Sequence, residues 1–236
     1  MLVQEKLDEI FTIYNKVTLF SDKNDCKAMR LRHKELSRDL VLHILEKPVT
    51  AYSILNDILC DNMPEIYDVF ECDDGVIVLE EFIDGDNIAV ISENGKIKQR
   101  EAVRIAKSVC LALAVLHNNG IVHRDIKPEN VMISKSGNVK LIDFNASRIM
   151  SAKSGDTVIM GTIGYAAPEQ LGLSQSDKRA DIYAVGVLLN IMLTGLHPTE
   201  KIAGGYLGHI IKKCTNLNAN RRYQTALQLY RALCLA

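Results

Sequence analysis

An eight-residue polar stretch, His123-Arg-Asp-Ile-Lys-Pro-Glu-Asn130, constrains the fold of this chain more than any other segment. Before it, apolar residues recur at helical spacing over 102–116, which predicts a long helix with one buried face. After it, the apolar run 131–133 predicts a short strand. The stretch is therefore a loop between a helix and a strand, and it holds the carboxylate of Asp125 and the amine of Lys127 close together.

The remaining pattern divides the chain into a strand-rich first part and a helical second part. Four strands are expected up to about residue 84, at 27–32, 39–45, 66–71 and 76–80, with a short helical stretch after Pro48. Helices are expected in the second part at 102–116, 181–193, 203–214 and 224–235. The connector 82–85 separates the two parts. The predicted class is α+β, with a small β-rich N-lobe and a larger helical C-lobe.

Composition excludes several classes of partner and site. The formal charge of −1 gives no electrostatic reason to expect a nucleic-acid partner. No apolar run reaches the roughly 18 residues that span a bilayer, and the first residues do not resemble a secretory signal, so we expect no membrane partner. Six scattered cysteines without a Cys-x-x-Cys pair favour reduced thiols and a cytoplasmic location. Oligomeric state cannot be inferred from this composition.

Further motifs follow in order. Eighteen residues after Asp125, a predicted strand ends in Leu141-Ile-Asp143-Phe144-Asn145, which supplies a second carboxylate. Gly161-Thr-Ile-Gly-Tyr-Ala-Ala-Pro-Glu169, Asp181-Ile-Tyr-Ala-Val-Gly186 and the stretch 218–223 come later. Together with 123–130, these segments resemble the ordered signature of eukaryotic-like Ser/Thr protein kinases, in a bacterial style. The resemblance implies one bilobal kinase domain over 1–236, with an N-lobe over about 1–84, a hinge at about 81–85 and a C-lobe over about 86–236.

The resemblance also implies chemical roles. Asp125 would orient the substrate hydroxyl and accept its proton, and Lys127 would neutralise the transferring phosphate. Asn130 and Asp143 would hold Mg²⁺ and thereby the phosphates of ATP, because hard oxygens are the ligands that Mg²⁺ prefers. The expected substrates are proteins with Ser or Thr acceptors, since Lys127 favours Ser/Thr over Tyr. The backbones of Glu81 and Ile83 would bond adenine.

Other positions would have structural roles. Thr162 would hydrogen-bond Asp125 and Lys127, and Asp181 would hold the backbone of the loop. His123 would pack in the interior, in a column with Phe144. Glu169 and Arg222 would form a buried ion pair.

The N-lobe departs from the kinase pattern. Residues 21–26 contain no glycine where a glycine-rich phosphate loop is expected, so side chains would hinder close approach to phosphates. His43 stands where the third strand should carry a phosphate-binding Lys, and no acidic residue within 50–54 could pair with it. Glu80 would be an unusual charge at the back of the adenine pocket. A replacement cation could come from three residues of the first hairpin: Lys23, Lys27 and Arg30.

These departures leave three functions open. The complete set of Asp125, Lys127, Asn130 and Asp143 favours an active Ser/Thr kinase, whose own phosphorylation sites would fall at Ser151, Ser154 or Thr157. The missing phosphate loop and Lys–Glu pair favour a pseudokinase that acts as a scaffold or an allosteric partner. A small-molecule kinase of the aminoglycoside type shares the Asp and Asn spacing, although 161–169 resembles a platform for protein substrates.

Overall fold

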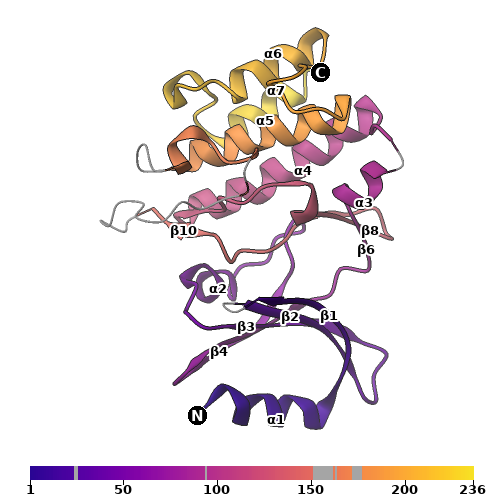
Figure 1. Cartoon of the computed structure of the whole chain (residues 1–236), viewed down its shortest axis with the longest axis vertical. Helices are drawn as coiled ribbons and strands as arrows, with labels where there is room; N and C mark the ends of the chain where they lie inside the picture. Colours follow the sequence, from indigo (N-terminus) through magenta and orange to yellow (C-terminus); the bar gives the residue numbers. More distant parts are fainter. Residues whose placement is uncertain (24–25, 94, 151–161, 163, 172–176) are drawn as a thin grey trace. The chain divides into compact units, whose positions relative to one another are not determined.

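The computed structural model divides the chain into two compact units, each described here by itself (Figure 1). Unit 1 contains residues 1–60 and 64–83, and unit 2 contains residues 61–63 and 84–236. The described residues are 1–23, 26–93, 95–150, 162, 164–171 and 177–236. Ser151, Ser154 and Thr157 lie outside them. No helix within these ranges is both long enough and apolar enough to cross a membrane.

Unit 1 is a five-stranded antiparallel sheet with a helix on each face. The strands lie in the order β1-β2-β3-β5-β4. Their bounds are β1 Tyr14–Lys23, β2 Cys26–His33, β3 Asp39–Leu45, β4 Ile66–Cys72 and β5 Gly75–Glu81. Helix α1 (Val3–Ile13) precedes the sheet, and α2 (Thr50–Leu55) follows β3. All four predicted strands are present, and β3 has the predicted bounds.

The two faces of this sheet have different surroundings. Neighbouring residues of a strand point to opposite faces. Leu42 pairs with Met29 and Leu79, and these side chains share a core with Leu7 and Ile10 of α1. His43, the next residue, therefore points to the other face. The α2 residue Tyr52 lies there, with its ring 6.0 Å from the His43 ring.

Two elements of unit 1 were not predicted from the sequence. Helix α1 carries Val3, Leu7 and Ile10 at helical spacing, a signal that was present but short. Strand β1 is an edge strand whose residues are mostly exposed, so it lacks a clear apolar alternation. Its presence makes β3 the third strand of the chain, and His43 lies on it.

Unit 2 is mainly helical. Its helices are α3 Ile88–Glu93, α4 Gln99–Asn118, α5 Lys178–Thr194, α6 Gly205–Cys214 and α7 Ala226–Leu233. Its short strands are β6 Gly85–Asn87, β7 Ile121–Val122, β8 Val131–Ser134, β9 Val139–Leu141 and β10 Arg148–Ile149. Single 3-10 turns lie at Pro128–Asn130, Pro168–Leu171 and Ala219–Arg221. The α+β class is confirmed.

Helix α4 organises unit 2. Its predicted apolar face is buried, from Ala102 to Leu116, and it packs against α5 and α7. Helix α5 is buried on nearly all sides and also packs against α6. Gly186 allows that contact, because a Cβ there would lie 2.4 Å from the Cβ of Cys214. The polar stretch 123–130 follows α4 and β7, and it ends in the 3-10 turn before β8.

Candidate active site

The backbone of the polar loop is held by one buried carboxylate. Asp181 of α5 is fully buried, and its oxygens accept hydrogen bonds from the backbone N–H of His123 (3.0 Å) and Arg124 (2.8 Å). Arg124 has a φ of 71°, a left-handed conformation that costs free energy for a residue other than glycine. The two hydrogen bonds stabilise this conformation. The prediction that Asp181 holds the loop backbone is confirmed.

Asp181 also pairs with a histidine from α4. His117 Nε2 lies 2.8 Å from Asp181 Oδ2, the oxygen that also accepts the hydrogen bond from the N–H of His123. Burial alone would raise the pKa of Asp181, but the hydrogen bond with His117 and the loop amides outweigh it, so this pKa is lowered. The carboxylate is therefore ionised, and it joins α4, α5 and the loop.

The side chains of the loop converge on Asp125. Lys127 Nζ lies 2.7 Å from Asp125 Oδ2 and donates to Thr162 Oγ1 at 2.9 Å. Thr162 in turn donates to Asp125 Oδ1 at 2.7 Å. Asn130 Nδ2 donates to the backbone carbonyl of Asp125 (2.8 Å) and to its Oδ2 (3.0 Å). The structure thus brings the three predicted catalytic side chains together and confirms the predicted contacts of Thr162.

These contacts set the charge of Asp125. Partial burial would raise the pKa of the carboxyl, but the hydrogen bonds from Lys127 and Thr162 outweigh it and lower the pKa. Asp125 is therefore ionised at neutral pH, beside a lysine that is held in place. A carboxylate and an ammonium at one point can orient a hydroxyl and neutralise phosphate charge.

Asp143 lies two residues beyond β9, in strained backbone. Its φ is 66°, and its Oδ1 accepts a hydrogen bond from the N–H of Asn145 at 3.1 Å. The next residue, Phe144, is fully buried and packs edge-to-face on His123, with ring centroids 5.6 Å apart. This contact confirms the predicted interior column. Strained left-handed residues that persist in a packed setting are typical of functional sites.

His123 is the neutral member of this column. Its burial lowers the pKa of the imidazole, although nearby carboxylates oppose the shift. Nε2 lies 3.3 Å from the carbonyl of Ile142, so it carries the proton and donates it there. His123 thereby links the loop to the segment that carries Asp143. Its role is structural and not catalytic.

The donors near Asp143 suit a hard cation. Both hydrogen bonds of Asn130 described above come from Nδ2, which leaves its Oδ1 as an available ligand. Asp143 adds carboxylate oxygens, and oxygen donors of this kind are those that Mg²⁺ prefers. Within the described residues, no group of three or more His, Cys, Asp or Glu side chains could hold a metal ion. A Mg²⁺ site built from Asp143 and Asn130 contains only one residue of these four types. The protein would thus supply two ligands, and other oxygen atoms would supply the rest.

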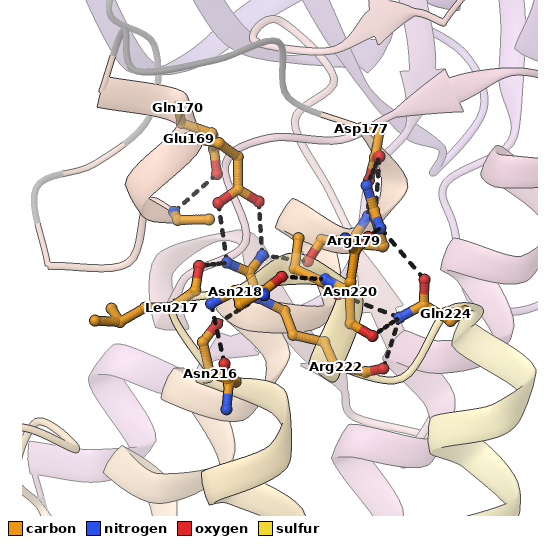
Figure 2. Close-up of polar contacts among 12 residues, drawn as sticks. Glu169, Gln170, Asp177, Arg179, Asn216, Leu217, Asn218, Asn220, Arg222 and Gln224 are labelled. Carbon is orange, nitrogen blue, oxygen red and sulfur yellow. Dashed lines mark hydrogen bonds and ion pairs between the residues drawn. The ribbon is translucent and has the colours of Figure 1, made fainter.

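A second polar network supports the loop from α5 and the C-terminal region (Figure 2). Arg222 forms two hydrogen bonds with Glu169, at 2.6 and 2.9 Å, and the side chain of Arg222 is fully buried. The predicted buried ion pair is confirmed. Gln170, next to Glu169, donates to the carbonyl of Arg124 at 2.8 Å. The ion-pair segment is therefore bonded directly to the polar loop.

The predicted nucleotide residues of unit 1 lie on β3 and after β5. His43 Nε2 is 2.9 Å from Glu80 Oε1, so the unusual charge of Glu80 has a partner. The backbone N–H of Glu81 bonds to the carbonyl of Glu65 at 2.9 Å, and Ile83 is buried at the end of the unit. Binding of adenine by Glu81 and Ile83, and of phosphate by His43, stays a prediction.

The candidate replacement cations have acidic partners of their own. Arg30 Nε donates to Asp39 at 3.0 Å, and its guanidinium lies 4.2 Å from the centre of the Phe82 ring. Lys27 pairs with Asp22 at 3.0 Å. The side chain of Lys23 lies outside the described part of the structure. Arg30 and Lys27 are thus both paired in this structure, and the role of either one as the phosphate-directed cation stays a prediction.

Comparisons with known proteins agree with this geometry. A family profile described as "Protein kinase domain" matches residues 14–231. The chain belongs to the protein kinase family. It is similar to the serine/threonine-protein kinase PrkC of Bacillus subtilis, with 38% identity over 145 residues, covering 59% of this chain and 22% of that protein. It is also similar to the serine/threonine-protein kinase pkn3 of Myxococcus xanthus, with 34% identity over 182 residues, covering 72% and 33%.

These matches confirm the resemblance to bacterial Ser/Thr kinases and, with the two units, the predicted kinase fold. A third relative, the probable serine/threonine-protein kinase PknB of Lactococcus lactis, is 36% identical over 142 residues, covering 59% of this chain and 23% of its own length. The matched region spans no more than a third of these relatives. Protein kinases as a family use ATP and Mg²⁺.

Two supporting residues were missed from the sequence. His117 has no sequence signal for this role, because its partner Asp181 is 64 residues away and no spacing rule links them. Gln170 was not singled out, although it directly follows the recognised Glu169. Its position directly after Glu169 was a sequence signal that could have identified it.

Proposed function

We propose that this protein kinase transfers the γ-phosphoryl group of ATP to Ser or Thr hydroxyls of protein substrates. The observation that carries the proposal is the closed set of contacts among Asp125, Lys127 and Thr162, with Asn130 bonded to the same carboxylate. Phosphoryl transfer requires little more than positioning and charge neutralisation, and these groups provide both.

Each residue has a defined role in the transfer. Asp125 orients the acceptor hydroxyl and takes its proton as the oxygen bonds to the γ-phosphorus. The bond between that phosphorus and the β–γ bridging oxygen breaks, and ADP leaves with that oxygen. Lys127 neutralises charge on the transferring group. Thr162 holds the side chains of Lys127 and Asp125 in place relative to each other. Asn130 and Asp143 would hold Mg²⁺, which would supply charge neutralisation at the phosphates.

In unit 1, the backbones of Glu81 and Ile83 bond adenine, and His43 contributes to phosphate binding. We propose that both units form one kinase domain with a hinge at residues 81–85. Protein substrates are favoured over small alcohols, because Glu169 closes a segment that resembles a protein-substrate platform, and its ion pair with Arg222 is intact.

Phosphate transfer with Mg-ATP tests this proposal. The protein should label a mixture of Ser- and Thr-containing acceptor proteins, and Asp143→Ala should remove the label. Labelling of the native protein no higher than that of Asp143→Ala would refute the proposal.

The second candidate is a pseudokinase that acts as a scaffold or an allosteric partner. It is favoured by one observation: Arg30, a candidate for the missing cation, is bonded to Asp39 within the sheet. Under this alternative, millimolar Mg-ATP would leave the melting temperature unchanged. A clear rise in melting temperature together with turnover would exclude it.

A further inference from the structure

A buried ion pair crosses the centre of the sheet in unit 1. His43 on β3 and Glu80 on β5 lie 2.9 Å apart, and their side chains are only 8% and 6% exposed. The strand register explains the contact, because Val41 pairs with Glu80 and Val78 with His43. The two residues are thus diagonal neighbours on the face opposite α1. Backbone pairing of adjacent strands fixes their separation.

Each member of the pair has a second polar atom that the sheet does not satisfy. Considering only the described residues, His43 Nδ1 and Glu80 Oε2 are buried and have no partner at hydrogen-bond geometry, although the Cys26 thiol of β2 lies close enough to act on the His43 ring. Buried polar atoms are almost always paired, and one left alone destabilises the fold. An unused donor at this position therefore points to an acceptor supplied from outside the protein.

The charge of the imidazole follows from its surroundings. Burial by itself would lower the pKa of His43, but the carboxylate of Glu80 and a contact with Cys26 outweigh it and raise the pKa to about 10. His43 is thus charged throughout the neutral range, as a lysine would be. The other titratable groups that the structure describes on this face of the sheet are Cys26, Arg30 and Arg32 on β2, Asp39 on β3, Glu71 on β4 and Tyr52 on α2.

Among these groups, Glu80 has the main influence on the charge of the His43 imidazole. Arg30 is neutralised by Asp39, and Glu71 is exposed on an edge strand. Tyr52 contacts the His43 ring through its own ring, at 6.0 Å. Removal of the Glu80 carboxylate would leave His43 buried. It would also remove the main group that opposes the lowering of the His43 pKa by burial.

We propose that Glu80 is a positioning residue for His43, and that this pair replaces the Lys–Glu pair of the family, with His43 Nδ1 donating to a phosphate oxygen of the nucleotide. The proposal rests on the proposed function. The carboxylate comes from the neighbouring strand β5, whereas the family pattern takes it from a helix. Helix α2 has no acidic residue in Thr50–Leu55 and therefore supplies no carboxylate to His43.

The ionisation of His43 tests the pair without any nucleotide. NMR titration of the His43 ring should give a midpoint well above 6.5 in the native protein. Glu80→Gln should bring the midpoint below 6.5, because burial of the ring then has only the contact with Cys26 acting against it. Glu71→Gln, a matched change on the same face, should leave it unchanged. A native midpoint at or below 6.5, or the same midpoint in Glu80→Gln, would overturn the proposal.

Affinity for Mg-ATP, measured by calorimetry at pH 5.5 and pH 8, tests the link to the nucleotide. The Kd of Glu80→Gln divided by that of the native protein should be near one at pH 5.5. At pH 8 the ratio should rise about tenfold to a hundredfold, the value of one charge-assisted hydrogen bond. Glu71→Gln should give a ratio near one at both pH values.

The outcomes separate this proposal from the proposed function. Native protein that binds Mg-ATP, with a Glu80→Gln ratio near one at pH 8, would overturn the role of the pair and leave the kinase assignment intact. Native protein that does not bind Mg-ATP at either pH would overturn both.

Discussion

Replacement of Arg222 by methionine should strongly destabilise unit 2. The Arg222 side chain is fully buried and donates to Glu169 and to the backbone carbonyls of Arg179 (2.9 Å) and Asn216 (2.7 Å). Arg222→Met leaves the Glu169 carboxylate and these carbonyls without their donor. Breaking a buried pair in this way costs about 3–5 kcal/mol. For a domain of this size, 1 kcal/mol corresponds to about 2–4 °C, so the melting temperature should fall by about 6–20 °C.

Thermal and urea unfolding followed by circular dichroism measure this loss. Arg104→Met is the matched control, because Arg104 pairs with Glu101 on the exposed side of α4, where an ion pair contributes at most about 1 kcal/mol. The double variant Glu169→Gln with Arg222→Met should recover part of the loss, since it no longer buries an unpaired charge. A loss for Arg222→Met no larger than that of Arg104→Met would refute the reasoning.

Three further predictions concern the loop and α5. Thr162→Val should lower kcat about tenfold or more with little change in melting temperature, because Lys127 and Asp125 lose their shared partner; steady-state kinetics with unfolding curves check this. The lowered pKa of Asp125 keeps its carboxylate ionised to lower pH than an ordinary aspartate. The acid limb of kcat should therefore lie below the usual range of a carboxyl group and should move upward in Lys127→Met, as a pH–rate profile would show. Gly186→Ala should cost about 1–3 kcal/mol in urea unfolding, because its new methyl group meets Cys214.

The sequence was sufficient for elements whose pattern is local. Strand β3 and the buried face of α4 each follow a single periodicity, and both were predicted. Helix α1 was missed because its apolar residues are few and its burial depends on a sheet formed later in the chain. Strand β1 was missed because an exposed edge strand needs no apolar alternation.

The candidate site also has parts that follow from a local sequence pattern and parts that depend on packing between distant segments. Asp125, Lys127 and Asn130 share one short loop, so their proximity could be predicted. The contact between His117 and Asp181 depends on how α4 packs against α5, which no local pattern encodes.

The contact between His43 and Glu80 in unit 1 depends on the register of two strands, which no local pattern encodes. His43 and Glu80 were each recognised as unusual, but separately. Their contact requires the pairing of β3 with β5, and one residue of slippage would place the two side chains on opposite faces.

The central claim is that Asp125 and its neighbours carry out phosphoryl transfer. The most direct test is single-turnover phosphate transfer by Asp125→Asn, measured beside its affinity for Mg-ATP. Loss of the proton acceptor should lower the rate of transfer by about 10²–10⁴, while the Kd for Mg-ATP stays within about threefold of the native value. Equal transfer rates in the two proteins would contradict the claim.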